Sequence, residues 1–161
     1  MAVIKVKRVT NGGYKYLDNT INYLTKDKDG REVIDVGGYG VNPDDPKDVA
    51  EQMKAVKEYY GKTGDNPIMH IMVSHDSSVK NEAQACEYSK QFAEYFAPDY
   101  QVYYATHCNE NGYDTHLAIN SVNYNDGKLF RSGTNDMKPF CDFVSELTGN
   151  KTNLYFEKNS K

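Results

Sequence analysis

Two histidines and an aspartate in the second half of the sequence have the types and spacing of a metal-binding cluster. Asp114 and His116 fall two residues apart on an expected strand, and His107 lies at the end of the strand before it. Alternate side chains of a strand share one face, and a short hairpin loop would place His107 beside the other two. Two imidazoles and a carboxylate can hold a divalent cation and leave positions open for substrate oxygens. Spacing alone supports two ordinary strand histidines and a surface aspartate equally well.

A tyrosine near the N-terminus is a candidate nucleophile. The pattern of Leu17, Ile21 and Leu24 predicts a helix over about 14–26 with these three residues as its buried stripe. At roughly 100° per residue, Tyr23 lies about 120° or more from the middle of that stripe, outside the core side of the helix. A phenol can attack phosphorus, but it is mostly protonated near neutral pH, so a nearby cation or base must assist. Without further support, a partly exposed packing tyrosine is the simpler interpretation.

A third group of polar residues, His70, Ser74 and His75, lies on an expected strand at 67–75. In a regular strand His70 and Ser74 face one way and His75 the other. Either histidine could line the site from a neighbouring strand, and each is explained at least as well as a structural histidine.

The elements that must position these residues form an α+β domain with a central, mainly antiparallel sheet and flanking helices. Strands interleave with helices, yet the best-supported neighbouring strands are joined by short loops, which favours antiparallel pairing. Strands are expected at 2–9, 32–41, 67–75, 101–108, 114–123 and 153–157, and helices at about 14–26, 46–61, 80–97 and 136–148.

Helix starts and buried stripes can also be predicted. Asp45 is a good N-cap with Pro46 at the first helical position, and Ser77 or Ser78 can cap the third helix. The expected buried residues are Val49, Met53, Val56 and Tyr60 in the second helix, and Met137, Phe140 or Cys141, Val144 and Leu147 in the last.

Length and composition set limits on the class of protein. The 161 residues are expected to form one domain, 1–161, and no stretch approaches the ~18 consecutive apolar residues that span a bilayer. The N-terminus lacks a secretory signal, and the three cysteines form no CxxC pair, so reduced thiols and a cytoplasmic location are expected.

The net charge of −4 argues against a large, non-specific surface for duplex nucleic acid. A narrow channel for a single strand needs only local cations and stacking rings, so nucleic acid is not excluded. Candidate phosphate contacts, each of which is otherwise a solvated charge, are Lys5, Lys7, Arg8, Lys128 and Arg131.

Several segments, in this order, resemble the relaxase/mobilisation nuclease family within the HUH (His-hydrophobic-His) endonuclease class. The matching segments are the first strand, the tyrosine helix with Ile21-Asn-Tyr23-Leu24, the strand His70-Ile-Met-Val-Ser74, Ala105-Thr-His107, Asp114-Thr-His116 with Ile119-Asn-Ser-Val122, and Gly127-Lys-Leu-Phe130. The resemblance covers nearly the whole chain, and several motifs in order are far more specific than any one of them.

The resemblance implies a metal-dependent DNA strand transferase. Tyr23 would attack single-stranded DNA at a transfer origin, leaving a 5′-phosphotyrosyl link, while His107, Asp114 and His116 would hold Mg²⁺ or Mn²⁺ against the scissile phosphate. Accessory relaxosome and coupling proteins are the implied partners, with no membrane insertion. The chain would be the N-terminal domain of a longer protein.

One position departs from the family pattern. Asp114 stands where the family has the first histidine of His-x-His, and a carboxylate favours Mg²⁺ or Mn²⁺ over softer ions. Asp114 could bind directly, bind through water, or yield its place to His75 or Glu110. His75, Glu110 and Asn120 are therefore candidate supporting residues.

Two alternatives stay open. A rolling-circle replication initiator uses the same chemistry but usually places its tyrosine after the histidines, where Tyr124 and Tyr155 lie. The other alternative is a non-catalytic module that binds single-stranded nucleic acid and in which the histidines are structural.

Overall fold

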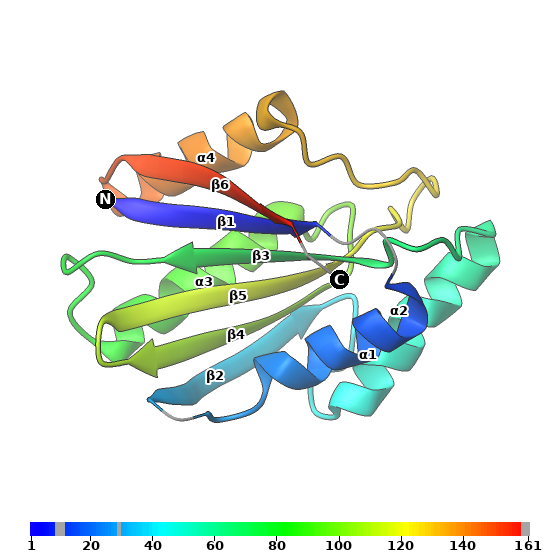
Figure 1. Ribbon diagram of the computed structural model, residues 1–161, viewed down its shortest axis with the longest axis horizontal. Helices are drawn as coiled ribbons and strands as arrows, with labels where there is room; N and C mark the ends of the chain where they lie inside the picture. Colours follow the sequence, from blue (N-terminus) through cyan, green and yellow to red (C-terminus); the bar gives the residue numbers. More distant parts are fainter. Residues whose placement is uncertain (9–11, 29, 159–161) are drawn as a thin grey trace.

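A six-stranded sheet forms the centre of the fold (Figure 1). The computed structural model describes residues 1–8, 12–28 and 30–158, apart from the side chains of Arg8 and Lys158. The strand order is β2-β4-β5-β3-β1-β6, and among the described residues only the β1–β6 pair is parallel. The strands are β1 (Ala2–Arg8), β2 (Arg31–Tyr39), β3 (Ile68–Ser74), β4 (Val102–Asn109), β5 (Gly112–Asn120) and β6 (Thr152–Lys158). The expected α+β class with a mainly antiparallel sheet is confirmed.

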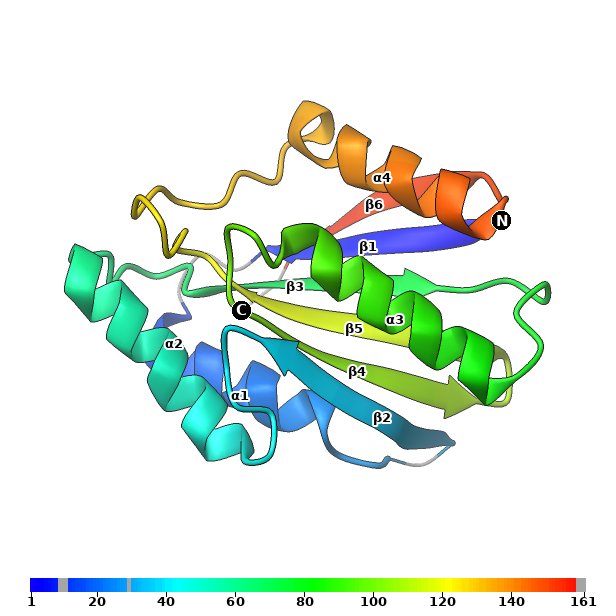
Figure 2. The ribbon, with the colours of Figure 1, turned by 180° about the vertical axis from the view of Figure 1, so that it is seen from behind.

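Helices cover both faces of the sheet. They are α1 (Gly13–Leu24), α2 (Pro46–Tyr60), α3 (Glu82–Phe96) and α4 (Thr134–Thr148). One face carries α1 and α2 and the opposite face carries α3 and α4, as Figures 1 and 2 show from the two sides. Among the described residues, no helix is both long enough and apolar enough to cross a membrane.

Strand alternation divides the core into two layers. On the α3/α4 face, Ile4, Ile71 and Leu117 pack against Phe92 and Phe140. On the other face, the predicted stripe of α1 (Leu17, Ile21 and Leu24) is fully buried against α2 and the strands. Burial of these side chains, at about 1.5–3 kcal/mol each, fixes the orientation of α1 on the sheet.

The start of α2 agrees with its sequence. The Asp45 side chain accepts a hydrogen bond from the Lys47 amide at 3.0 Å, and Pro46 is the first helical residue. The predicted stripe is corrected by the structure, because Lys57 is completely buried while Val56 and Tyr60 are only partly buried. The Lys57 ammonium donates to Asn120 Oδ1 and to Ser121 Oγ at 3.0 Å, and these partners make burial possible.

The cap of α3 is a second correction. Asn81, and not Ser77 or Ser78, caps the helix, since its side chain accepts from the Gln84 amide at 2.9 Å. The Ser78 hydroxyl instead donates to the Asp76 carboxylate.

Candidate active site

Three histidines from neighbouring strands lie together beneath α1. His70 (β3), His107 (β4) and His116 (β5) are almost completely buried on the α1/α2 face of the sheet. The ring centroids of His107 and His116 are 4.2 Å apart, and those of His70 and His116 are 5.2 Å apart. The register places Ala105 opposite His116 and Ala118 opposite His70, and these small side chains leave room for the rings.

Tyr23, in the last turn of α1, lies over this cluster. Its ring is half-buried and meets the rings of His116, His70 and His107 edge-on, at centroid distances of 5.7, 5.8 and 6.4 Å. His107 Nε2 hydrogen-bonds the Leu24 carbonyl at 2.8 Å, so the end of α1 is fixed to the cluster itself. The structure thus brings together a phenol and two histidines that lie more than 80 residues apart in the sequence.

The histidines are neutral in the folded protein. Burial lowers the pKa of His70 to about 3, lowers that of His116 well below its usual value, and lowers that of His107. Because the Leu24 carbonyl can only accept, His107 Nε2 carries the proton and Nδ1 carries a lone pair. That Nδ1 is buried and has no hydrogen-bond partner among the described residues. His70 Nε2 and His116 Nδ1 share a second hydrogen bond of 2.9 Å, which orients the His116 ring.

Cationic side chains from β1, β2 and the segment after α1 lie around the Tyr23 ring. The Arg31 guanidinium carbon is 4.3 Å from the ring centroid, Lys28 Nζ is 4.8 Å away and Lys7 Nζ is 5.7 Å away. Arg31 Nη2 donates to the carbonyls of Lys26, at 2.5 Å, and Tyr23, at 3.3 Å, which holds the guanidinium over the ring. The buried Arg31 Nε has no partner among the described residues. A phenol, neutral imidazoles and several cations together suit a reaction at a phosphate.

Residues 16–151 match the family model "Relaxase: MobA/VirD2-like, nuclease domain". The chain belongs to this relaxase family. Relaxases of this kind are nicking endonucleases that bind single-stranded DNA at an origin of transfer, and they generally use a divalent metal ion. The family agrees with both the fold and the resemblance drawn from the motifs.

Two curated relatives, each called Protein rlx and each from Staphylococcus aureus, are similar to this relaxase domain. One is 29% identical over 137 residues, covering 84% of this chain and 38% of the relative, and the other is 32% identical over 79 residues, covering 49% and 24%. The chain therefore spans well under half the length of these relatives. No solved structure matches the chain.

The third expected metal ligand, Asp114, lies on the same strand face as His116. It is opposite His107 in the β4–β5 register, is half-buried, and its carboxylate accepts from Asn109 Nδ2 at 3.1 Å. In the described part of the chain, no three His, Cys, Asp or Glu side chains are placed to hold a metal ion together. The metal set of His107, Asp114 and His116 stays a prediction.

The structure does not bring His75 to the cluster. Its ring stacks on Tyr88 and Phe92 of α3, on the opposite face of the sheet, at centroid distances of 5.5 and 5.7 Å. Burial lowers its pKa to about 4. His70 and His75 are an odd number of residues apart and must face opposite sides, so only His70 faces Tyr23.

The other supporting candidates also lie outside the cluster. Glu110 is exposed in the β4–β5 turn. Asn120 is buried at the end of β5, where its oxygen accepts from Lys57 and its nitrogen donates to the Met53 carbonyl at 3.1 Å. Asn120 therefore ties α2 to the sheet.

The candidate phosphate contacts fall into two places. Lys5 and Lys7 project from β1 on the sheet face that bears His70, because Lys7 is opposite His70 in the β1–β3 register. Lys128 and Arg131 line a separate pocket. The Arg8 side chain lies outside the described residues.

Neither alternative tyrosine has a ring contact with a histidine in the described structure. The exposed Tyr124 hydroxyl donates to the Ala97 carbonyl at 2.6 Å, and Tyr155 is 52% exposed on β6. Among the residues near Tyr23, Lys28 and Arg31 were not predicted. Both follow Tyr23 closely in the sequence, and that proximity was the one available signal.

Proposed function

We propose that this relaxase domain nicks and rejoins single-stranded DNA at a transfer origin through a covalent link to Tyr23. The observation that carries the proposal is the position of the Tyr23 ring, edge-on over three buried, neutral imidazoles and flanked by the cations of Lys7, Lys28 and Arg31.

The reaction exchanges one phosphate ester for another. The Tyr23 oxygen attacks the scissile phosphorus, a bond from this oxygen to phosphorus forms, and the bond from phosphorus to the 3′ oxygen breaks. The phenol gives up its proton and the departing 3′ oxygen gains one, so the products are a 5′-phosphotyrosyl ester and a 3′ hydroxyl. Negative charge that gathers on the phosphate is stabilised by Arg31, Lys28 and Lys7. The reverse reaction rejoins a strand, and no nucleotide cofactor is consumed.

A divalent ion, Mg²⁺ or Mn²⁺, would polarise the phosphate when bound. We assign its ligands to His107 Nδ1 and to His116, with Asp114 as the oxygen donor. The fit rests on the donor chemistry of this chain: His107 Nδ1 is a buried lone pair with no partner in the described residues, and both imidazoles are neutral. The hydrogen bond that His107 donates to the Leu24 carbonyl, and the one that His116 shares with His70, would orient the two rings, as outer partners of metal-bound histidines commonly do.

The position of the other tyrosines supports Tyr23 over a nucleophile that follows the histidines. Tyr124 and Tyr155 lie away from the three imidazoles, which weighs against the rolling-circle initiator arrangement. Recruitment of relaxosome and coupling proteins, as expected from the resemblance, is part of the proposal.

Covalent capture of DNA tests the proposal. The domain is incubated with a random-sequence pool of single-stranded oligonucleotides and Mn²⁺, and adducts that survive denaturing electrophoresis are isolated and mapped by mass spectrometry. We expect a nucleotide on the Tyr23 peptide. The Tyr23→Phe variant should bind the pool and form no adduct, with Tyr155→Phe as the matched control that retains it. Adducts of equal yield in Tyr23→Phe would rule out Tyr23 as the nucleophile.

A further inference from the structure

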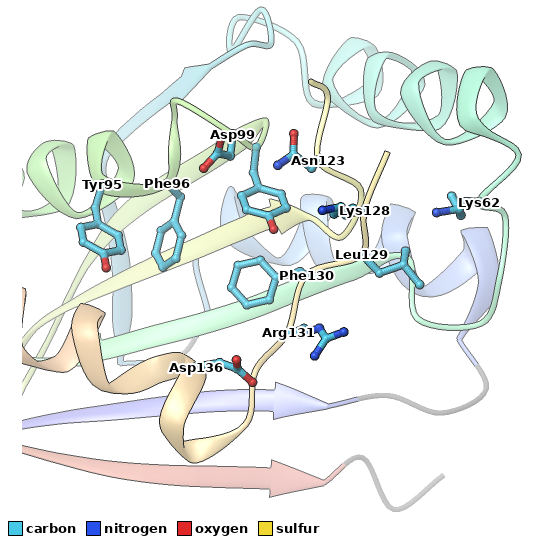
Figure 3. Close-up of a pocket in the computed structure, with 11 residues that line it drawn as sticks. Lys62, Tyr95, Phe96, Asp99, Asn123, Lys128, Leu129, Phe130, Arg131 and Asp136 are labelled. Atoms are coloured by element: carbon cyan, nitrogen blue, oxygen red, sulfur yellow. The ribbon is translucent and has the colours of Figure 1, made fainter. Parts of the chain in front are cut away.

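A second pocket lies away from the Tyr23 cluster, beside the end of α3 and the start of α4. Its volume is about 930 Å³. Figure 3 shows the side chains that line it, which come from three segments of the chain. They are Lys62, Tyr95, Phe96, Asp99, Tyr100, Asn123, Lys128, Leu129, Phe130, Arg131 and Asp136.

One part of this pocket is aromatic. The Phe130 ring packs against Tyr100 and Phe96, at centroid distances of 5.1 and 5.7 Å, and Tyr95 continues the row at 5.0 Å from Phe96. Phe130 and Tyr100 are only partly buried, Tyr95 is 36% exposed and the neighbouring Leu129 is 55% exposed. Flat rings that keep an accessible surface at a pocket are suited to stack on a planar ligand.

The other part is cationic. Lys128 and Arg131 are exposed, and neither side chain makes an ion pair or a side-chain hydrogen bond within the described structure. In Figure 3 they lie on the side of Phe130 away from Tyr95.

The two carboxylates of the pocket already have partners. Asp136 accepts from the Gly133 amide at 3.0 Å, and Asp99 accepts from Asn125 Nδ2 at 3.3 Å. With Lys62, the pocket has three cations against two anions, in a chain whose net charge is −4.

We propose that this pocket binds an unpaired nucleotide of the DNA strand, with the base against Phe130 and Tyr100 and the phosphate at Lys128 and Arg131. This inference rests on the proposed function, because it gives the same single-stranded substrate a second point of attachment. The combination of aromatic rings and unpaired cations favours a single-stranded nucleotide over two other ligands. An acidic peptide would contact the cations but would not stack on the rings, and a duplex keeps its bases stacked inside the helix. Attachment at two points raises the affinity for a long strand over that for a short one.

Binding measurements on the complete domain test the pocket. Fluorescence anisotropy is recorded with a mixed-sequence single strand and with its duplex, in a salt series, for Lys128→Gln/Arg131→Gln. The control is Lys47→Gln/Lys80→Gln, which removes two exposed lysines elsewhere. Loss of two phosphate contacts should lower the slope of log K against log salt by about 1.4 for the single strand. Affinity for the single strand should fall about 5-fold or more, with a smaller loss for the duplex.

Photocrosslinking tests the base. A single strand containing 5-iodouracil should crosslink to Tyr95, Tyr100 or Phe130, and the double variant should lose that crosslink. A salt slope and affinity equal to those of the control would overturn the proposal, as expected if the pocket takes an acidic peptide. A lowered slope without crosslinks to these rings would also overturn it, because the pocket would then bind phosphate alone. Failure of the wild-type domain to form a covalent adduct would count against the Tyr23 chemistry. The binding measurements could still be interpreted, because they do not require the adduct.

Discussion

The buried lysine of α2 predicts an unusual dependence of stability on pH. Lys57 is completely buried, and within the described structure its side-chain nitrogen has only the neutral partners Asn120 and Ser121. Burial lowers the pKa of Lys57 to about 7, from an ordinary value of 10.5. Between these values the unfolded chain binds a proton that the folded chain does not, so the free energy of unfolding rises as pH increases through this window. Below pH 7 the folded protein bears the full cost of the buried charge.

The size of the effect follows from the two pKa values. Integrating the difference in protons bound by the unfolded and folded states from pH 7 to pH 9, Lys57 should add about 2 kcal/mol to the free energy of unfolding. For a domain of this length, that corresponds to roughly 4–8 °C in Tm. The histidines of the cluster contribute little in this window, since their ordinary pKa of 6.5 and their lowered pKa values in the folded protein all lie below it, and this small contribution is the same in the Lys57 variant. The Tyr39 and Tyr103 pKa values are raised to about 12, above the window.

The free energy of unfolding is measured by urea titration at pH 7 and pH 9 for three proteins: the wild type, Lys57→Met and Lys47→Met. Lys47→Met is the control, because Lys47 is exposed. Lys57→Met leaves Asn120 and Ser121 without their partner and lowers stability at both pH values, so the informative quantity is the difference between them. Wild type and Lys47→Met should gain about 2 kcal/mol more than Lys57→Met on going from pH 7 to pH 9. An equal gain in all three proteins would refute the conclusion that burial lowers the pKa of Lys57 to about 7.

Three further predictions concern the site and the scaffold. Asp114→Ala should weaken Mn²⁺ binding measured by calorimetry, and unchanged affinity would point to a different third ligand. Arg31→Gln should slow formation of the covalent adduct on the order of 10²-fold while DNA affinity changes little, and Arg31→Lys should retain part of the rate. Equal rates in the wild type and both variants would show that Arg31 takes no part in the reaction. Asp45→Ala should lower the free energy of unfolding by about 1 kcal/mol in urea titrations, and no change would mean that the Lys47 amide finds water instead.

The elements of the fold were predictable because each is specified locally. The i, i+4, i+7 pattern of Leu17, Ile21 and Leu24 defines the buried side of α1, and all three side chains are buried. The Asp45-Pro46 pair fixes the start of α2 in the same way. The predictions were wrong where residues distant in the sequence determine which side chain is buried. Lys57 replaces Val56 in the core because Asn120 and Ser121, more than 60 residues away, receive its ammonium.

The site was predictable in part for the same reason. Alternation places Asp114 and His116 on one face, and the hairpin aligns His107 with Asp114 as expected. Alternation also separates His70 from His75 but does not reveal which of them faces α1, since that depends on how β3 pairs with both β1 and β5. Lys28 forms an isolated bridge with Arg31, the first residue of β2, and no periodic pattern marks either residue, so only the assembled sheet shows them beside Tyr23.

The charge around Tyr23 explains how a chain with a net negative charge can bind a polyanion such as DNA. Burial keeps the three imidazoles neutral, so the positive charge there comes from Lys7, Lys28 and Arg31. The nearby carboxylates are engaged elsewhere: Asp27 accepts from the Val33 amide at 2.8 Å and Asp114 accepts from Asn109. A protonated imidazole would add cationic charge but lose the lone pair that a metal ion requires. Neutral histidines beside permanent cations therefore let one site present ligands to a metal ion and positive charge to a phosphodiester at the same pH.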